Sequence, residues 1–133
     1  MTSRGRPRAT RPQRAAPPAA LWLAADALAE RKALEPLVLD LRDLTAAADY
    51  FVIVSGTSDA HVRGMAEHVV TTLAPHGVRP HHVEGMSQGR WVLLDFVDIV
   101  VHLFHPEARA FYQLERLWND APRFVPVAER KSQ

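Results

Sequence analysis

The stretch from Tyr50 to Asp59, YFVIVSGTSD, decides the fold of this chain. Its first five residues are all β-branched or aromatic and do not alternate with polar residues, which is typical of a central strand covered on both faces. The four residues from Gly56 to Asp59 then end the strand. Thr57 or Ser58 can cap a following helix, and Asp59 suits its first turn, where free backbone N–H groups favour negative charge. The segment therefore predicts a buried strand that leads directly into a helix.

Apolar spacing on both sides of this segment predicts the remaining elements. Before it, apolar residues three and four apart indicate a helix over 20–33, and a strand follows over 37–41. After it, the helix continues to residue 73. Three strands are expected over 78–84, 90–94 and 99–104, and Pro106 opens a last helix that ends near residue 119. The order α-β-β-α-β-β-β-α predicts an α/β or α+β sandwich in which helices flank a mixed sheet of about five strands.

Length and composition limit the class of protein. The chain has 133 residues, of which 47% are hydrophobic and 23% charged, as expected for one globular domain. No apolar run approaches the roughly 18–20 residues that cross a bilayer, so no membrane span is expected. The sequence has no cysteine. This excludes disulfides, thiolate nucleophiles and cysteine-bound metal sites, and it fits a reducing compartment such as the cytoplasm.

Charge is distributed unevenly along the chain. Residues 1–20 contain five arginines and no acid. The rest of the chain holds the other 11 of the 16 lysines and arginines and all 15 acids, which gives a net charge of −4. A mildly acidic domain argues against sequence-specific reading of nucleic acid and permits a basic protein partner.

The same distribution predicts the domain organisation. The Arg- and Pro-rich residues 1–19 cannot bury enough apolar surface to fold, and they are expected to form a disordered arm. A transit peptide is an alternative, although the four prolines of this segment oppose the amphipathic helix that it needs. Residues 20–125 are expected to form the domain, and residues 126–133 a loose tail.

Three sets of residues suggest catalysis or ligand binding, and each has a simpler structural explanation. The seven histidines follow no metal-binding pattern, so no metal site and no cofactor are expected. The loop Gly56–Asp59 lies where anions bind at helix N-termini, but helix capping explains its residues. Asp95 and Asp98 could form a catalytic carboxylate pair, but both also suit a tight turn between two strands.

Aromatic residues of the last expected helix point to two different environments. Helical spacing places Phe111, Leu114 and Trp118 on one stripe that faces the core. Tyr112 falls on another side, together with the charged residues Glu115 and Arg116. The spacing therefore predicts that Tyr112 is an exposed aromatic residue beside charges.

Two aromatic residues of the expected hairpin are further candidates for a binding surface. Trp91 shares one face of its strand with Leu93 and Asp95, and it belongs either to the core or to an interface. Phe96 lies inside the Asp95–Asp98 reversal and is expected to be exposed, because turn tips face solvent. A small acidic domain with exposed aromatic residues and no convincing active site favours a binding module over an enzyme.

Three long segments carry a family resemblance. They are Ala48–Val62 (ADYFVIVSGTSDAHV), Val83–Gly85 together with Arg90–His102 (VEG and RWVLLDFVDIVVH), and Phe111–Trp118 (FYQLERLW). In their order and residues they resemble the ribosomal silencing factor family, also called the Iojap family. The resemblance covers about residues 21–122, and the arginine-rich arm lies outside it.

The resemblance implies a fold and a function. The family fold is an α/β sandwich similar to that of nucleotidyltransferases, without established transferase activity. Members bind the large ribosomal subunit through its protein number fourteen, which forms part of an intersubunit bridge. The bound factor sterically blocks the small subunit, so translation is repressed when nutrients are limiting. The resemblance also implies a partner face made of Trp91, Asp95, Phe96, Tyr112, Glu115 and Arg116, with Leu93 and Asp98 as further candidates.

Other functions stay open at this point. A nucleotidyltransferase-like enzyme needs a pair of acids one residue apart after its Gly-Ser signature, and here Asp59 stands alone. A factor that assists assembly of the large subunit would use the same face as a silencing factor. The aromatic patch could also pair two copies in a homodimer. The arginine-rich arm could contact ribosomal RNA through phosphates, or it could be an inert tail or the product of a misassigned start.

Overall fold

The computed structural model describes residues 15–126, so most of the expected tail and most of the expected arm lie outside the described residues. The predicted order of elements is confirmed, with a short 3₁₀ helix added after residue 73 and further additions near the C-terminus. The elements are α1 (Ala19–Glu30), β1 (Leu34–Asp40), β2 (Tyr50–Ser55), α2 (Asp59–Leu73), the short 3₁₀ helix η2 (Ala74–His76), β3 (His82–Glu84), β4 (Trp91–Asp95), β5 (Ile99–Phe104), α3 (Pro106–Tyr112), α4 (Leu114–Leu117) and β6 (Arg123–Phe124).

The strands form one mixed sheet of six strands in the order β3-β4-β5-β2-β1-β6. The central strands β2 and β5 run parallel, with Tyr50 opposite Ile99 and Ser55 opposite Phe104, and all other neighbours are antiparallel. The parallel pair explains why both strands consist almost entirely of apolar residues, since both of their faces are covered. The predicted mixed sheet is therefore confirmed, with one strand more than expected.

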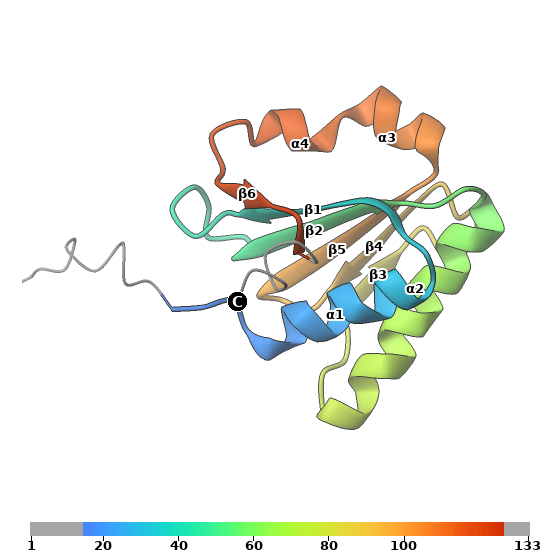
Figure 1. Ribbon diagram of the computed structural model, residues 1–133, viewed down its shortest axis with the longest axis horizontal. Coiled ribbons are helices and arrows are strands. Elements are labelled where there is room, and N and C mark those ends of the chain that lie inside the picture. The colour runs from blue at the N-terminus through green and yellow to red at the C-terminus, as the bar shows by residue number, and fades with distance from the viewer. Residues whose placement is uncertain (1–14, 127–133) are drawn as a thin grey trace, which may run out of the picture.

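Helices cover the sheet on both sides (Figure 1). The helices α1 and α2 pack on one side, where the larger core cluster joins Leu21 and Leu28 of α1 to Met65 and Val69 of α2. The helices α3 and α4 lie across the other side, over a smaller cluster that includes Phe104. This second layer is short, so part of the sheet face beneath it stays half-exposed.

The loop after β2 forms as its sequence predicts. Ser58 caps α2, because its Oγ accepts a hydrogen bond from the backbone N–H of His61 at 3.1 Å. Asp59 occupies the first turn. At the other end, Pro75 lies in η2 and Gly77 has the left-handed φ of 78° that ends the helical segment.

The C-terminal part differs from the prediction in two ways. The single helix expected over 106–119 is divided at Gln113, whose φ of 47° is left-handed, into α3 and α4. The added strand β6 pairs with β1 through Val38 and Phe124, and Phe124 packs against Trp22 of α1 at 5.9 Å between ring centroids. Within residues 15–126, no helix has the length and apolar character needed to cross a membrane.

Candidate functional site

The strand β4 carries the centre of the candidate site. Its burial alternates, with Val92 and Leu94 fully buried in the cluster beneath α1 and α2, and Trp91, Leu93 and Asp95 half-exposed on the opposite face. The predicted sharing of one face by these three residues is thus confirmed. Their partners across β5 are Phe104, His102 and Val100, respectively.

Trp91 contributes both to the core and to the exposed surface, the two environments that its sequence position allowed. Its ring lies 4.8 Å from that of Phe104 and 4.9 Å from that of Tyr112, measured between centroids. The same side chain is only half-buried, so it contributes to the core beneath α3 and also presents apolar surface. Trp91 is therefore held in a fixed orientation, which lowers the entropy that it loses when a partner covers it.

His102 fixes the orientation of Trp91. The indole Nε1 donates a hydrogen bond to Nδ1 of His102 at 3.1 Å, so the imidazole is neutral and carries its proton on Nε2. His102 is 3% exposed, and burial lowers its pKa to about 4. Its Nε2 has no hydrogen-bond partner among the described residues. The neutral imidazole thus accepts the indole hydrogen bond and holds the Trp91 ring in place.

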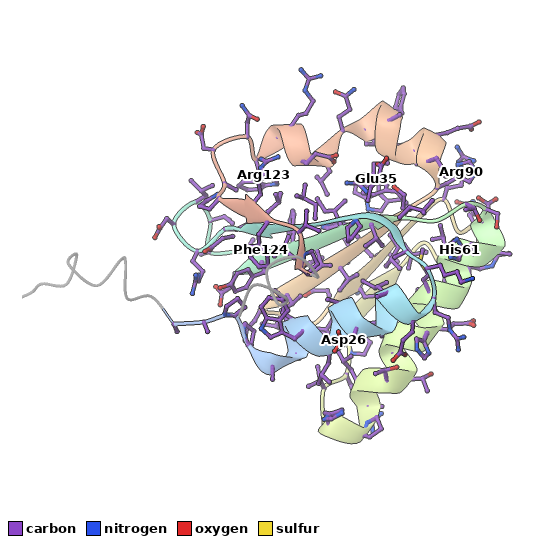
Figure 2. The ribbon with its side chains drawn as sticks, viewed as in Figure 1. Asp26, Glu35, His61, Arg90, Arg123 and Phe124 are labelled. Atoms are coloured by element: carbon purple, nitrogen blue, oxygen red, sulfur yellow. The ribbon has the colours of Figure 1, made fainter. Side chains whose placement is uncertain are left out.

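Beside Trp91 the surface is hollowed into a cavity of about 460 Å³, here called the aromatic groove. The groove is lined by Trp91, Phe111 and Tyr112, together with Gly85, Gln88, Arg90, Glu107 and Ala108. Tyr112 is 52% exposed, so its predicted exposure is confirmed. Arg90 and Glu107 form an exposed ion pair of 3.2 Å at the rim, near the start of α3 (Figure 2).

Phe111 was expected in the core, and the structure places it on the surface. Its side chain is 79% exposed and contacts Tyr112 edge-on at 5.0 Å between centroids. The reason is the left-handed Gln113, which turns the chain so that Leu114 is buried while Phe111 is not. Phe111 therefore joins the aromatic groove, and helical spacing alone could not reveal it.

Phe96 was expected to be exposed, and the structure shows that it is buried. Only 9% of Phe96 is accessible, because its side chain folds from the turn into the cluster beneath α1 and α2. The backbone N–H of Phe96 donates to the carbonyl of Ile99, which closes the turn, and Val97 occupies the exposed tip with a φ of 77°. Asp95 stabilises this turn by accepting the N–H of Val97 at 2.8 Å, as turn chemistry predicts.

The eight residues expected on one face do not all come together. Trp91, Leu93, Asp95 and Tyr112 share the half-open face, and Asp98 is exposed at the turn beyond Asp95. Glu115 and Arg116 instead line a different cavity with Arg109, on the side of α3 away from the aromatic groove. The break at Gln113 causes this separation, since an unbroken helix would have continued the face of Tyr112 to both residues.

Polar groups of the Gly56–Asp59 loop are hydrogen-bonded to neighbouring residues of helix α2. Ser58 caps α2, and the backbone N–H of Thr57 donates to Nδ1 of His61 at 2.8 Å. These contacts agree with the expected role of the loop in capping α2. Within residues 15–126, no group of three His, Asp or Glu side chains is placed to hold a metal ion. The expected homodimer stays a prediction.

Comparisons with known proteins identify the same family as the resemblance described above. A family model described as "Ribosomal silencing factor during starvation" matches residues 14–133. The "Ribosomal silencing factor RsfS" of Bacillus subtilis is 40% identical over 102 residues, which cover 77% of this chain and 86% of that protein. A mouse protein named "Mitochondrial assembly of ribosomal large subunit protein 1" is 40% identical over 74 residues, 53% of this chain and 32% of that protein. A crystal structure of a Chromobacterium violaceum protein superposes with a TM-score of 0.74 at 34% identity, covering 76% of this chain and 84% of that one.

Proposed function

This chain belongs to the ribosomal silencing factor family, and on that premise we propose that it binds the large ribosomal subunit and prevents the small subunit from joining it. The proposed contact is the protein number fourteen of the large subunit. The consequence is repression of translation in the cytoplasm when nutrients are limiting. The likeness of the fold to nucleotidyltransferases remains a prediction, and the proposal assigns no catalytic role to any residue.

The observation that supports the proposal is the partly exposed face of the sheet around Trp91, next to the aromatic groove. Monomeric proteins rarely leave several large aromatic residues side by side on the surface unless a partner covers them. Here Trp91, Phe111 and Tyr112 line one groove, and Trp91 is held in place by Phe104 and His102. Rigid aromatic residues of this kind are the usual anchors of protein interfaces.

Charge supports a basic partner. The residues outside the arginine-rich arm have 11 positive and 15 negative side chains. Asp95 and the exposed Asp98 lie beside the aromatic face at the end of β4. An acidic patch next to apolar anchors accelerates the encounter with a basic ribosomal protein, while the aromatic contacts slow dissociation. We therefore propose a face made of Trp91, Leu93, Asp95, Phe111 and Tyr112, without the buried Phe96.

A subunit-joining experiment tests the function. Purified subunits are mixed at a magnesium concentration that promotes joining, with and without the protein, and separated on a sucrose gradient. We expect the protein to migrate with the large subunit and the joined-ribosome peak to fall. Absence of the protein from the large-subunit fractions would overturn the proposal.

The variant Tyr112→Ala tests the face. Tyr112 is 52% exposed, so its loss should leave the domain folded. Truncating a central aromatic anchor costs about 2 kcal/mol of binding free energy, roughly a thirtyfold loss of affinity for the large subunit. Leu44→Ala is the matched control, because Leu44 is 41% exposed but does not line the groove. Equal affinities of the two variants would place the interface elsewhere.

A second candidate function is assembly of the large subunit. The name of the mouse relative favours it, and such a factor would use the same face. The gradient experiment separates the two functions. Migration with the large subunit without a decrease in joined ribosomes would support assembly and contradict silencing.

A further inference from the structure

A second cavity, of about 500 Å³, lies on the other side of α3 and is here called the polar pocket. Its polar lining consists of Glu35, Ser55, Arg109, Gln113, Glu115 and Arg116. In Figure 2, Glu35, near the start of β1, lies on the side of the sheet that faces α3, and it lines the pocket. The volume falls within the range of about 300–1,000 Å³ that is usual for sites of small molecules. The proposed function makes no use of this cavity.

The position of the polar pocket in the sheet is one at which related architectures bind ligands. Ser55 is the last residue of β2, which runs parallel to its neighbour β5. The chain leaves β2 for α2 on one side of the sheet and leaves β5 for α3 on the other (Figure 1). In open sheets, the crevice beyond the carboxyl ends of two such parallel strands is the usual ligand site.

Arg109 is the cation at the base of the polar pocket. It is 9% exposed, and its Nη1 donates to the carbonyl of Glu35 at 2.8 Å and to Oγ of Ser55 at 3.0 Å. Its Nε is 3.4 Å from Oε2 of Glu115. These contacts leave Nη2 without a partner among the described residues. A guanidinium held by one edge in this way can offer its remaining nitrogen to an anionic group.

Glu115 is the anion that contacts Arg109 in the polar pocket. Its Oε2 faces Arg109, whereas its Oε1 is buried without a hydrogen-bond donor among residues 15–126. A buried acceptor without a donor is costly, and a ligand that supplies an N–H group after a small rotation of the carboxylate would remove that cost. The pocket therefore has acceptor capacity on Glu115 and donor capacity on Arg109.

Backbone strain is concentrated around the same pocket. Glu35 has a φ of 49° and Gln113 a φ of 47°, so two of the four non-glycine residues with positive φ among residues 15–126 line it. Such conformations are unfavourable for residues with a side chain and persist mainly where the structure needs them for a site. Glu35 presents its carbonyl to Arg109, and Gln113 orients Arg116 by accepting from its Nη1 at 2.7 Å.

We propose that the polar pocket binds a small zwitterion of the amino-acid class. Two arginines and two glutamates line the pocket, so its formal charge is zero and it suits a ligand that carries both charges and no net charge. The carboxylate of the ligand is held between Arg109 and Arg116, and its ammonium group is held by Glu115. Leu34, Pro106 and Ala110 line the pocket as well and accommodate an aliphatic side chain.

Nuclear magnetic resonance titration of the full chain tests the proposal without ribosomes. The probes are L-alanine, L-leucine, L-serine and L-glutamine, added one at a time. Acetate, methylammonium and inorganic phosphate serve as ligands that carry only one charged group. We expect at least one amino acid to cause saturable shifts of the backbone amides of Glu35, Gln113 and Glu115 and of the Nε–H of Arg109. The one-group probes should bind at least about tenfold more weakly, because acetate and phosphate lack the contact with Glu115 and methylammonium lacks the contacts with the two arginines.

The variant Arg116→Gln tests ligand binding in the polar pocket without disturbing the fold. Arg116 is exposed, so its substitution should leave the domain folded. Loss of one charge-assisted contact should weaken amino-acid binding by about tenfold or more. Arg79→Gln is the matched control, an exposed arginine that does not line the pocket. The proposal is overturned if no amino acid shifts the pocket resonances, if phosphate or acetate binds as tightly as the amino acids, or if Arg116→Gln binds like Arg79→Gln.

Discussion

At the scale of single residues, a few buried polar side chains shape both cavities. His102 supports Trp91 on one side of α3, and Arg109 ties α3 to the start of β1 and the end of β2 on the other. Both side chains are at least nine-tenths buried. Groups of this kind are costly to bury unless their hydrogen bonds are made, so their presence fixes the position of the neighbouring elements.

His102 predicts a pH dependence of folding. Its pKa is lowered from 6.5 to about 4 by burial, so the unfolded chain binds a proton between these values and the folded chain does not. The free energy of unfolding should therefore fall as the pH decreases through this window. Between about pH 7 and about pH 4.5, this one group should remove roughly 2 kcal/mol.

Urea unfolding of His102→Gln across the same pH range is the measurement. Glutamine can accept the hydrogen bond of Trp91 but does not titrate, so the variant should lose about 2 kcal/mol less than the natural chain on acidification. The difference between the two proteins cancels the contribution of the exposed histidines. A parallel decrease in both proteins would contradict the buried, neutral state of His102.

At the scale of elements, the turn between β3 and β4 positions the aromatic face. Gly85 follows β3 with a φ of 85°, and a Cβ at this position would lie 2.1 Å from the carbonyl oxygen of Trp91. Only glycine tolerates both the backbone angle and this contact. The turn thereby sets the register in which Trp91 begins β4.

Two glycine-to-alanine variants test this turn. Gly85→Ala should lower the free energy of unfolding by more than about 2 kcal/mol, because strain and steric overlap add. Gly64→Ala is the control in α2, where a Cβ meets nothing within 4 Å, and should raise stability by roughly 0.5–1 kcal/mol. Chemical unfolding of both variants gives these values. A Gly85→Ala protein as stable as the natural chain would contradict the described turn.

Local sequence signals account for most elements and for part of the site. The run Tyr50–Val54 and the cap at Ser58 are encoded by neighbouring residues, and the alternation in β4 places Trp91, Leu93 and Asp95 together. Other features depend on contacts between distant segments. The strand β6 has two residues and exists because Phe124 packs on Trp22 and pairs with Val38.

The break at Gln113 explains why the rest of the site could not be predicted. Neither proline nor glycine marks the break, and helical spacing through position 113 places Phe111 in the core and Glu115 beside Tyr112. Arg109 reaches from α3 to Glu35 and to Glu115, and these distant contacts accompany the change of direction. The burial of Phe96 could not be predicted for a similar reason, because it depends on a core that the turn residues do not encode.

At the scale of the whole molecule, charge separates the arginine-rich segment from the domain. Residues 1–14 hold five arginines and lie outside the described residues, while the remaining chain is acidic. If the proposed interface is formed by the domain alone, deletion of residues 1–14 should leave the affinity for the large subunit and its dependence on salt unchanged. Binding measured by sedimentation at several salt concentrations tests this prediction. A shallower salt dependence after the deletion would instead show contacts of these arginines with RNA phosphates.

The parallel pairing of β2 with β5 also has a consequence for the kinetics of folding. Tyr50 pairs with Ile99, so the centre of the sheet joins segments between which α2, β3 and β4 must already have been synthesised. Closing so long a loop is slow compared with forming the local β4–β5 hairpin. During synthesis, the edge of the apolar strand β2 that pairs with β5 stays unpaired until β5 has been made. Nascent chains that end before residue 104 therefore expose a strand that is prone to aggregation.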